Sequence, residues 1–340
     1  MAEKTCLSAS RIKTFQSCSW LYFFKYKLKA PDKSNDGAKR GSVCHSVFET
    51  LGEEAYKNEF KKIIKKQDIF ASKKIKELVL IEAKKYGVDD EENMSLIKDM
   101  TLNGLNYDFY GDAFGKINQA LSEKEFEFDV NEENINYRIK GFIDKLFIFN
   151  EDNAIVRDFK SSKEVFKGKD VEDNLQDLMY VLAAKKLHPF LKKVTSEFIF
   201  LKFPPKQGVI KMKEVSDQEL KGFEIQLTEL QQMLDNFSEK DATKNLAGKK
   251  DYPKDGSFSG PLLCGFAKFA GEKKKDNTDK WHCPAKFAFD FYQIKDKSNS
   301  IIDSCFLDDY DEYKEKYPEA SFALVRYSGC PHWNKNIDRS

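Results

Sequence analysis

Two acids and a lysine stand at corresponding points of two neighbouring apolar segments. The segment AIVRDFKSSKE places Asp158 and Lys160 two positions apart, and the preceding segment GFIDKL carries Asp144. Because side chains alternate along a strand, Asp158 and Lys160 share one face while Phe159 points to the other. If the turn between the segments takes three residues (150–152), Asp144 falls opposite Asp158, whereas a two-residue turn pairs Asp144 with Phe159.

This arrangement predicts a site for a hard divalent cation. Two close carboxylates repel each other, burial increases the repulsion, and a cation such as Mg²⁺ relieves it because it prefers oxygen ligands. A bound cation also lowers the pKa of its water, and Lys160 beside it would orient or deprotonate that water. Such chemistry suits phosphodiester hydrolysis. The alternative is a buried structural ion pair between Asp158 and Lys160.

Three more side chains could serve this chemistry. Gln176 and Tyr180 stand four positions apart on one predicted helix, so they share a face and can hydrogen-bond phosphate or a base edge. His45 lies in GSVCHSVFE, on a predicted amphipathic helix. Each has a structural alternative, the pair as part of a helix surface and His45 as a satisfied structural residue.

The elements that must hold these residues follow from hydrophobic periodicity. Alternation predicts strands over 123–130, 135–149 and 154–162, separated by NEEN and NEDN, which have hairpin composition. Two more strands are predicted over 193–203 and 208–215.

Helical spacing predicts a helix that opens at Ser8 and others over 41–58, 171–187 and about 216–235, with a loop over 31–40. Beyond residue 240 no clear periodicity appears. The order of these elements predicts a mixed α/β core, with a central and partly antiparallel sheet flanked by helices.

Composition limits the classes of function. The 340 residues carry a net charge of only +1, so a general basic coat for nucleic acid is absent and any polyanion site is local. The positive charge is mostly lysine, which favours phosphate contact over base reading. No apolar run reaches the length of a membrane span, and seven cysteines, an odd number, suit a reducing cytosol. We therefore expect a cytoplasmic protein without a membrane partner.

Five short motifs together resemble the RecB-type branch of the PD-(D/E)XK nuclease superfamily, which includes AddB and CRISPR-adaptation nuclease domains. Their order and spacing are far more specific than any one motif, and they cover roughly residues 7–200. The segment LSASRIKTFQSCSWLYFFKY resembles the opening helix of that branch. The other motifs are Gly-x-x-x-His in GSVCH (His45), Gly-x-x-Asp in GFIDKL (Asp144), Asp-x-Lys in RDFKS (Asp158, Lys160) and Gln-x-x-x-Tyr in QDLMY (Gln176, Tyr180).

The resemblance implies a restriction-endonuclease-like fold and a role for each residue of the motifs. His45, Asp144 and Asp158 would bind Mg²⁺ or Mn²⁺, with the main-chain carbonyl of Phe159 as a further ligand. Lys160 would position the attacking water.

The resemblance also implies contacts with the substrate, and we expect the chain to divide into three regions. Gln176 and Tyr180 would hold the DNA strand near the site. A helical region over 1–120 would carry the histidine motif, and 121–240 would form the nuclease core. A C-terminal extension over 241–340 would pack back on the N-terminal region.

Several members of this branch carry a [4Fe–4S] cluster on four cysteines, one before the nuclease motifs and three after them. Here Cys18, Cys264 and Cys283 match three of the positions, and Ala267 stands at the other. Three alternatives are open. Another side chain supplies the fourth ligand of the cluster, the site binds zinc in place of the cluster, or the site is degenerate and its thiols are core residues. Side chains that would complete the set are His282, Cys6 and Cys330.

The resulting hypothesis is a Mg²⁺- or Mn²⁺-dependent DNA nuclease. We favour an exonuclease on DNA ends or single strands, in recombination, repair or phage DNA processing. No P-loop motif is present, so unwinding would come from a helicase or recombination partner. High lysine and scarce arginine suit an enzyme of a bacterial or phage-infected cytoplasm. Alternatives are a structure-specific or nicking endonuclease and a non-catalytic DNA-binding subunit that keeps the fold.

Overall fold

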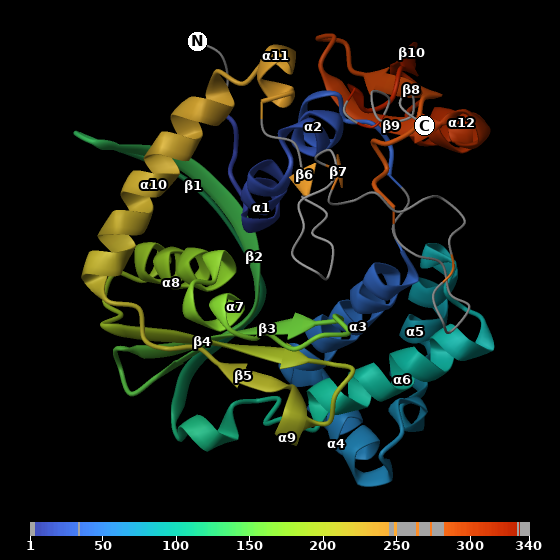
Figure 1. Cartoon of the computed structure of the whole chain (residues 1–340). Helices are drawn as coiled ribbons and strands as arrows, with labels where there is room; N and C mark the ends of the chain where they lie inside the picture. The colour runs from blue at the N-terminus through green and yellow to red at the C-terminus, as the bar shows by residue number, and fades with distance from the viewer. Residues whose placement is uncertain are drawn as a thin grey trace, which may run out of the picture. The chain divides into compact units, whose positions relative to one another are not determined.

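A computed structural model divides the chain into two units, whose elements Figure 1 shows. The first unit contains 1–9 and 34–231, and the second contains 10–33 and 232–340. The three regions expected from the sequence have bounds that differ from those of these two units, and that division stays a prediction. No helix among the described residues is long and apolar enough to cross a membrane. The structure describes residues 4–32, 35–244 and 282–331, with positions 248–249, 263–264, 273 and 333.

A mixed sheet forms the centre of the first unit and confirms the predicted α/β class (Figure 1). Its strands are β1 (Ile117–Glu132), β2 (Ile135–Phe149), β3 (Asn153–Lys160), β4 (Lys193–Phe200) and β5 (Val209–Lys211). They lie in sequence order, with β3 and β4 parallel and all other neighbours antiparallel. The parallel pair needs a crossover, and the chain between these two strands supplies a helix.

The turn between β2 and β3 sets the register of the two acids. Phe149 pairs with Asn153, which leaves 150–152 as a three-residue turn. Continued one step past its last pair, this register places Asp144 opposite Asp158. Of the two registers that the sequence leaves open, the structure therefore has the one that brings the acids together.

Helices α3 to α6 lie together on one side of the sheet (Figure 1). Their apolar side chains form one core with Phe159 and Ile199 of the sheet. Alternation turns the residues on either side of Phe159 to the opposite face. The elements of this part are α3 (Asp36–Gly52), α4 (Lys57–Lys66), α5 (Lys73–Tyr86) and α6 (Glu91–Leu105), with 3₁₀ turns at Glu54–Tyr56, Ile69–Ala71 and Asp112–Phe114.

Helix α3 begins earlier than the sequence analysis predicts. A loop was expected over 31–40, but the helix begins at Asp36. The side chain of Asn35 accepts a hydrogen bond from the N–H of Ala38 at 3.0 Å and caps the helix. Residues with loop composition therefore form its first turn.

The crossover helix α8 (Leu175–Leu187) lies on the other side of the sheet (Figure 1). It begins where it does because the side chain of Asn174 accepts hydrogen bonds from the N–H groups of Gln176 and Asp177. This start places its first two turns next to the end of β3. The remaining helices of this unit are α7 (Lys169–Glu172), α9 (Pro205–Gly208) and most of α10 (Asp217–Asp235).

The second unit joins the N-terminal aromatic segment to a three-stranded sheet of order β10-β8-β9. The buried Trp20 donates its indole N–H to the hydroxyl of Tyr327 at 2.7 Å. Because periodicity is unclear beyond residue 240, the sequence does not predict this sheet. Its elements are α1 (Ala9–Ser17), α2 (Ser19–Tyr22), a π-helix (Phe23–Lys27), α11 (Glu239–Ala242), β6 (Gly248–Lys249), β7 (Leu263–Cys264), β8 (Phe289–Lys295), β9 (Ile301–Phe306), a 3₁₀ turn (Leu307–Asp309), α12 (Tyr310–Lys316) and β10 (Ser321–Tyr327).

Candidate metal centre

The acids of β2 and β3 meet beside Lys160, where the pairing of the two strands ends. Asp144 and Asp158 are buried, with 8% and 3% of their surface exposed. The Nζ of Lys160 lies 2.6 Å from Oδ2 of Asp158. The N–H of Phe159 donates to Oδ2 of Asp144 at 2.7 Å. The backbone of one strand thus fixes the carboxylate of the other.

Helix α3 brings His45 to the same point. Its Nε2 lies 3.2 Å from the carbonyl oxygen of Phe159, and its Nδ1 lies 3.5 Å from Oδ1 of Asp144. Four residues earlier, a Cβ at Gly41 would stand 2.8 Å from the hydroxyl oxygen of Ser161. The glycine of the Gly-x-x-x-His motif therefore leaves room for the side chain of Ser161 where the helix approaches the end of β3.

Helix α8 supplies two hydrogen-bond partners of Asp158. The side-chain amide of Gln176 donates to Oδ1 of Asp158 at 3.0 Å, and the hydroxyl of Tyr180 donates to the same atom at 2.6 Å. The Nζ of Lys160 donates to Oε1 of Gln176 at 2.8 Å. The two side chains therefore orient the acid and the lysine, while their contact with DNA stays a prediction.

A carboxylate that the sequence analysis missed joins this group. The Oε1 of Glu123 lies 3.4 Å from Nδ1 of His45. Ligand atoms of Glu123, His45 and Asp144 all lie within 4.8 Å of one another. The turn between β1 and β2 has two residues (133–134), and the pairs on either side place Glu123 opposite Asp144. Counting residues outward from the turn NEEN gives the same pairing of Glu123 with Asp144. In the sequence, however, Glu123 has the character of a solvent-facing residue at the start of a strand.

The electrostatics of the site favour a bound proton or a bound cation. Burial, together with the charge of Asp158, raises the pKa of Asp144 to about 8. Burial alone would lower the pKa of His45, but Asp144 and Glu123 outweigh it and raise the pKa to about 9. A cation would replace these protons, because metal ligands bind in their deprotonated form.

The donor atoms fit a hard divalent cation. The group offers carboxylate oxygens and the main-chain carbonyl of Phe159, which Mg²⁺ and Mn²⁺ favour, together with one imidazole. The buried Oδ2 of Asp158 has no hydrogen-bond partner of good geometry, although Lys160 lies beside it. A buried oxygen without a full hydrogen bond is costly, and a cation would satisfy it.

The second unit holds another group of ligand-type side chains. Cys18, Cys283 and Cys330 lie in one buried apolar cluster. Gly329 has a φ of +86°, and a Cβ there would stand 3.1 Å from the carbonyl oxygen of Lys286. The N–H of Cys330 donates to that same oxygen at 3.2 Å, and the N–H of Lys286 donates to the carbonyl of Cys283 at 3.2 Å. These contacts place Cys330 beside the turn that carries Cys283.

The alternatives for these cysteines differ in the spacing that they require between sulfur atoms. The sulfur atoms of Cys18, Cys283 and Cys330 do not all lie within 4.8 Å of one another. A tetrahedral zinc site with 2.3 Å bonds needs sulfurs about 3.8 Å apart. An iron–sulfur cluster holds its thiolates further apart, since each binds a different iron. The side chain of Cys264 lies outside the described residues, and His282 is half-buried.

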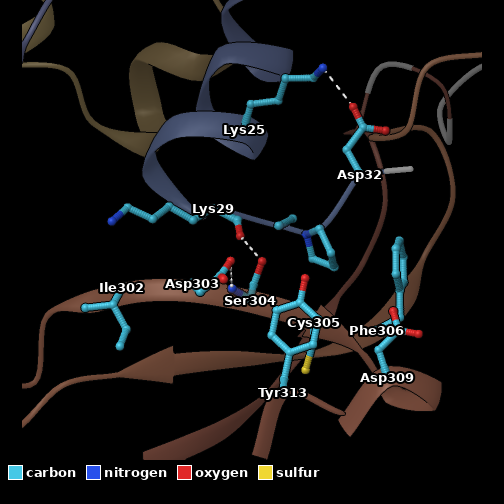
Figure 2. A pocket seen from close by; sticks show the side chains of 12 residues that line it. Lys25, Lys29, Asp32, Ile302, Asp303, Ser304, Cys305, Phe306, Asp309 and Tyr313 are labelled. Atoms are coloured by element: carbon cyan, nitrogen blue, oxygen red, sulfur yellow. Dashed lines mark hydrogen bonds and ion pairs between the residues drawn. The ribbon is translucent and has the colours of Figure 1, made fainter. Parts of the chain in front are cut away.

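A hollow of about 480 Å³ also lies in the second unit, and Figure 2 shows its lining side chains. Lys25 pairs with Asp32 at 2.8 Å across one end of it. The hydroxyl of Ser304 donates to the carbonyl of Lys29 at 2.5 Å. No three ligand-type side chains of the described residues converge here. The hollow therefore lacks the chemistry that marks the strand ends of the first unit.

Comparison with known families gives one extensive match. The sequence model of the PD-(D/E)XK nuclease superfamily matches residues 6–264, a stretch that contains every residue of the candidate metal centre. No curated protein matches the chain.

Two solved structures are similar to the chain. A presumed exonuclease from Eubacterium rectale is 10% identical, and the match covers 68% of this chain and 81% of that chain, with a TM-score of 0.42. The protein SSO0001 is 17% identical, and the match covers 65% of this chain and 87% of that chain, with a TM-score of 0.26. Likeness at these TM-scores carries no argument about function.

Proposed function

Because the chain belongs to the PD-(D/E)XK nuclease superfamily, we propose that it is a Mg²⁺- or Mn²⁺-dependent nuclease that hydrolyses phosphodiester bonds in DNA. The observation that carries this proposal is the convergence of His45, Asp144, Asp158 and Lys160 at one point. A subunit that only binds DNA has no need of two buried acids beside an ammonium and an imidazole, because burying them is costly.

The residues that would hold the cation are Asp144, Asp158, His45 and the carbonyl of Phe159, with Glu123 as a further acid. When bound, the cation would polarise the phosphodiester and lower the pKa of a water ligand. Asp144 and His45 give up their protons to bind it, so cation affinity rises with pH.

Lys160 would orient the water that attacks the phosphorus. Its ammonium donates a hydrogen bond to Oε1 of Gln176 and forms an ion pair with Asp158, and an ammonium with three N–H groups keeps a donor for the water. Fixed partners keep the ammonium in one position, and such positioning is a large part of hydrolytic catalysis. We assign Gln176 and Tyr180 two tasks, which are to hold Asp158 and to contact the DNA strand.

We favour exonuclease action on DNA ends or single strands in a bacterial or phage-infected cytoplasm, with unwinding supplied by a helicase or recombination partner. A structure-specific or nicking endonuclease is the alternative. The test is a time course on end-labelled single- and double-stranded DNA and on covalently closed plasmid, with Mg²⁺ and with Mn²⁺. An exonuclease leaves closed circles intact, whereas an endonuclease opens them.

Asp158→Asn is the matched control, since it reports nuclease activity from contaminants. Cleavage by the wild type and none by this variant is the expected result. Absence of cleavage on every form of DNA would overturn the nuclease proposal in favour of a DNA-binding subunit.

We also propose that the second unit binds an iron–sulfur cluster through Cys18, Cys283 and Cys330. The three thiols share one buried cluster, and an iron–sulfur cluster tolerates thiolates that lie further apart than those of a zinc site. Cys330 would take the place that Ala267 leaves, and Cys264 stays the predicted fourth ligand. The proposal concerns how this unit is held together and assigns the cluster no step in hydrolysis.

The readout for the cluster is iron and acid-labile sulfide per chain after purification without oxygen. Cys330→Ser should lose most of both. Cys305→Ser is the matched control, because Cys305 is 1% exposed in the same unit but lies on β9 outside the cluster. Zinc in place of iron, or full iron in Cys330→Ser, would overturn the assignment.

A further inference from the structure

An aromatic side chain beside the metal centre is open to solvent. Phe142 on β2 has 54% of its surface exposed, whereas Phe147 on β2 and Phe126 on the neighbouring β1 are each 1% exposed. Single exposed apolar side chains are common on protein surfaces, so exposure alone carries little. The exposure of Phe142 is informative because of its position relative to the metal centre.

Phe142 stands two residues before Asp144 on a continuous strand, so the two side chains share a face of the sheet. Ile143 between them is buried on the other face. Two strand residues span about 7 Å. The ring therefore lies within reach of a base next to a phosphate at the metal centre.

Charges around Phe142 indicate which part of a nucleic acid meets the ring. Glu125, directly opposite on β1, is exposed, whereas Glu127, two residues further on the same face, pairs with Arg138 and lies opposite Lys140. The carboxylate of Glu125 repels phosphate, so a sugar–phosphate backbone is disfavoured directly beside the ring. A base carries no charge and has a flat aromatic face, so it can lie against the ring.

The phosphate of the same strand has partners on the α8 side of the site. Lys160 and Gln176 lie there, in contact with Asp158. A strand with its phosphate at these residues and its base towards Phe142 satisfies both groups of side chains. Glu125 would repel the second backbone of a duplex that passed beside the ring, whereas an unpaired strand has no second backbone.

We propose that Phe142 is a stacking platform for one base of an unpaired DNA strand, next to the phosphate that is cleaved. This inference rests on the proposed nuclease function and deepens it, because it names single-stranded DNA as the preferred substrate. Stacking on an aromatic ring is tolerant of base sequence, since every base has a π-face. Cleavage should therefore prefer unpaired DNA without a strong sequence preference.

The test compares Phe142→Ala and Phe142→Trp with the matched control Phe190→Ala. Phe190 is 55% exposed, almost the same as Phe142, but lies after the end of α8. Anisotropy with labelled single-stranded and duplex DNA of one sequence measures affinity, with Ca²⁺ in place of Mg²⁺. Phe142→Ala should bind single strands about tenfold or more weakly and duplex within about twofold of wild type. Phe142→Trp should restore binding, and Phe190→Ala should match wild type.

An abasic position beside the cleaved phosphate gives an independent readout. It should weaken binding by the wild type and leave binding by Phe142→Ala unchanged. Equal single-strand affinity for Phe142→Ala and wild type, or equal losses on single-stranded and duplex DNA, would overturn the platform. A wild type that cuts no DNA but shows Phe142-dependent binding would remove the nuclease proposal and leave the platform standing.

Discussion

The two ligand groups of this chain are built in opposite ways. In the first unit, Asp144 and Asp158 are fixed by hydrogen bonds from the backbone and from α8, at a junction of regular elements. In the second unit, the three cysteines lie in an apolar core made by segments far apart in the sequence. The first group is polar and suited to hydrolysis, and the second is suited to holding chain segments together. The contrast predicts that mutations will separate catalysis from cluster binding.

Asp158→Asn should give the largest effect and the cleanest separation. The change removes a charge that would bind the cation and pair with Lys160, while the hydrogen-bonding shape is kept. We expect kcat for DNA cleavage to fall about a hundredfold to ten thousandfold, with iron content unchanged. Cleavage assays with Mn²⁺ and iron analysis on the same preparation provide the measurement. Near-wild-type cleavage would contradict the assignment of Asp158 to the metal centre. Loss of iron would contradict the independence of the metal centre and the cysteine group.

Glu123→Gln tests the metal centre of the first unit. The amide keeps the size of the side chain and removes the charge beside His45. We expect the Mn²⁺ concentration for half-maximal cleavage to rise about tenfold or more, with a smaller change at saturating Mn²⁺. Glu229→Gln, at an exposed position of α10, is the control. An unchanged Mn²⁺ requirement would remove Glu123 from the metal centre.

Two glycine substitutions test whether the units lose stability independently. Gly329→Ala places a Cβ at a φ of +86° and 3.1 Å from the backbone of Lys286, in the second unit. Gly104→Ala places a Cβ 2.5 Å from the ring of Phe48, in the first unit. Each should lower the free energy of unfolding of its own unit by about 1–3 kcal/mol.

Hydrogen exchange followed by mass spectrometry reads the two units separately. Faster exchange confined to the mutated unit is the expected pattern. Equal acceleration in both units for either variant would show that the two regions unfold together, and the comparison would lose its basis.

Asp177→Asn should have the smallest effect and a defined pH dependence. Burial raises the pKa of Asp177 from 3.8 to about 6, against the opposing hydrogen bond from Ser196. Between these values the folded state keeps a proton that the unfolded state releases, so wild-type stability falls as pH rises through this window. The Asp177→Asn variant has no carboxyl group at this position, so its stability does not fall in this way as pH rises. Urea unfolding should show nearly equal stability of variant and wild type at pH 4 and a more stable variant at pH 7. An identical gain at both pH values would contradict the assignment.

Much of the first unit could be predicted because its information is local. The strand over 135–149 has the bounds expected from alternation. The register of Asp144 with Asp158 depends only on the length of one turn. Glu123 was missed because it lies near an end of the predicted alternating segment 123–130, where an acid is typical of a solvent-facing position, although the register of the β1–β2 hairpin places it opposite Asp144.

The second unit could not be predicted in the same way. Strands β8 to β10 have mixed burial patterns in which few positions are fully buried, so alternation is weak. Cys330 approaches Cys283 through a left-handed turn at Gly329, a contact that no periodicity encodes. Sequence spacing pointed to position 267, whereas the packing of distant segments points to Cys330.

The composition of the second unit from 10–33 and 232–340 has a consequence for synthesis of the chain. The aromatic segment around Trp20 and Phe24 leaves the ribosome before its partners in the core, which follow about 220 to 310 residues later. At about 5–20 residues per second, that delay is about 10–60 s. For this time the nascent protein carries an unpaired apolar segment inside an otherwise foldable unit. Chaperones that recognise exposed apolar chain should therefore bind that segment until the last hundred or so residues emerge.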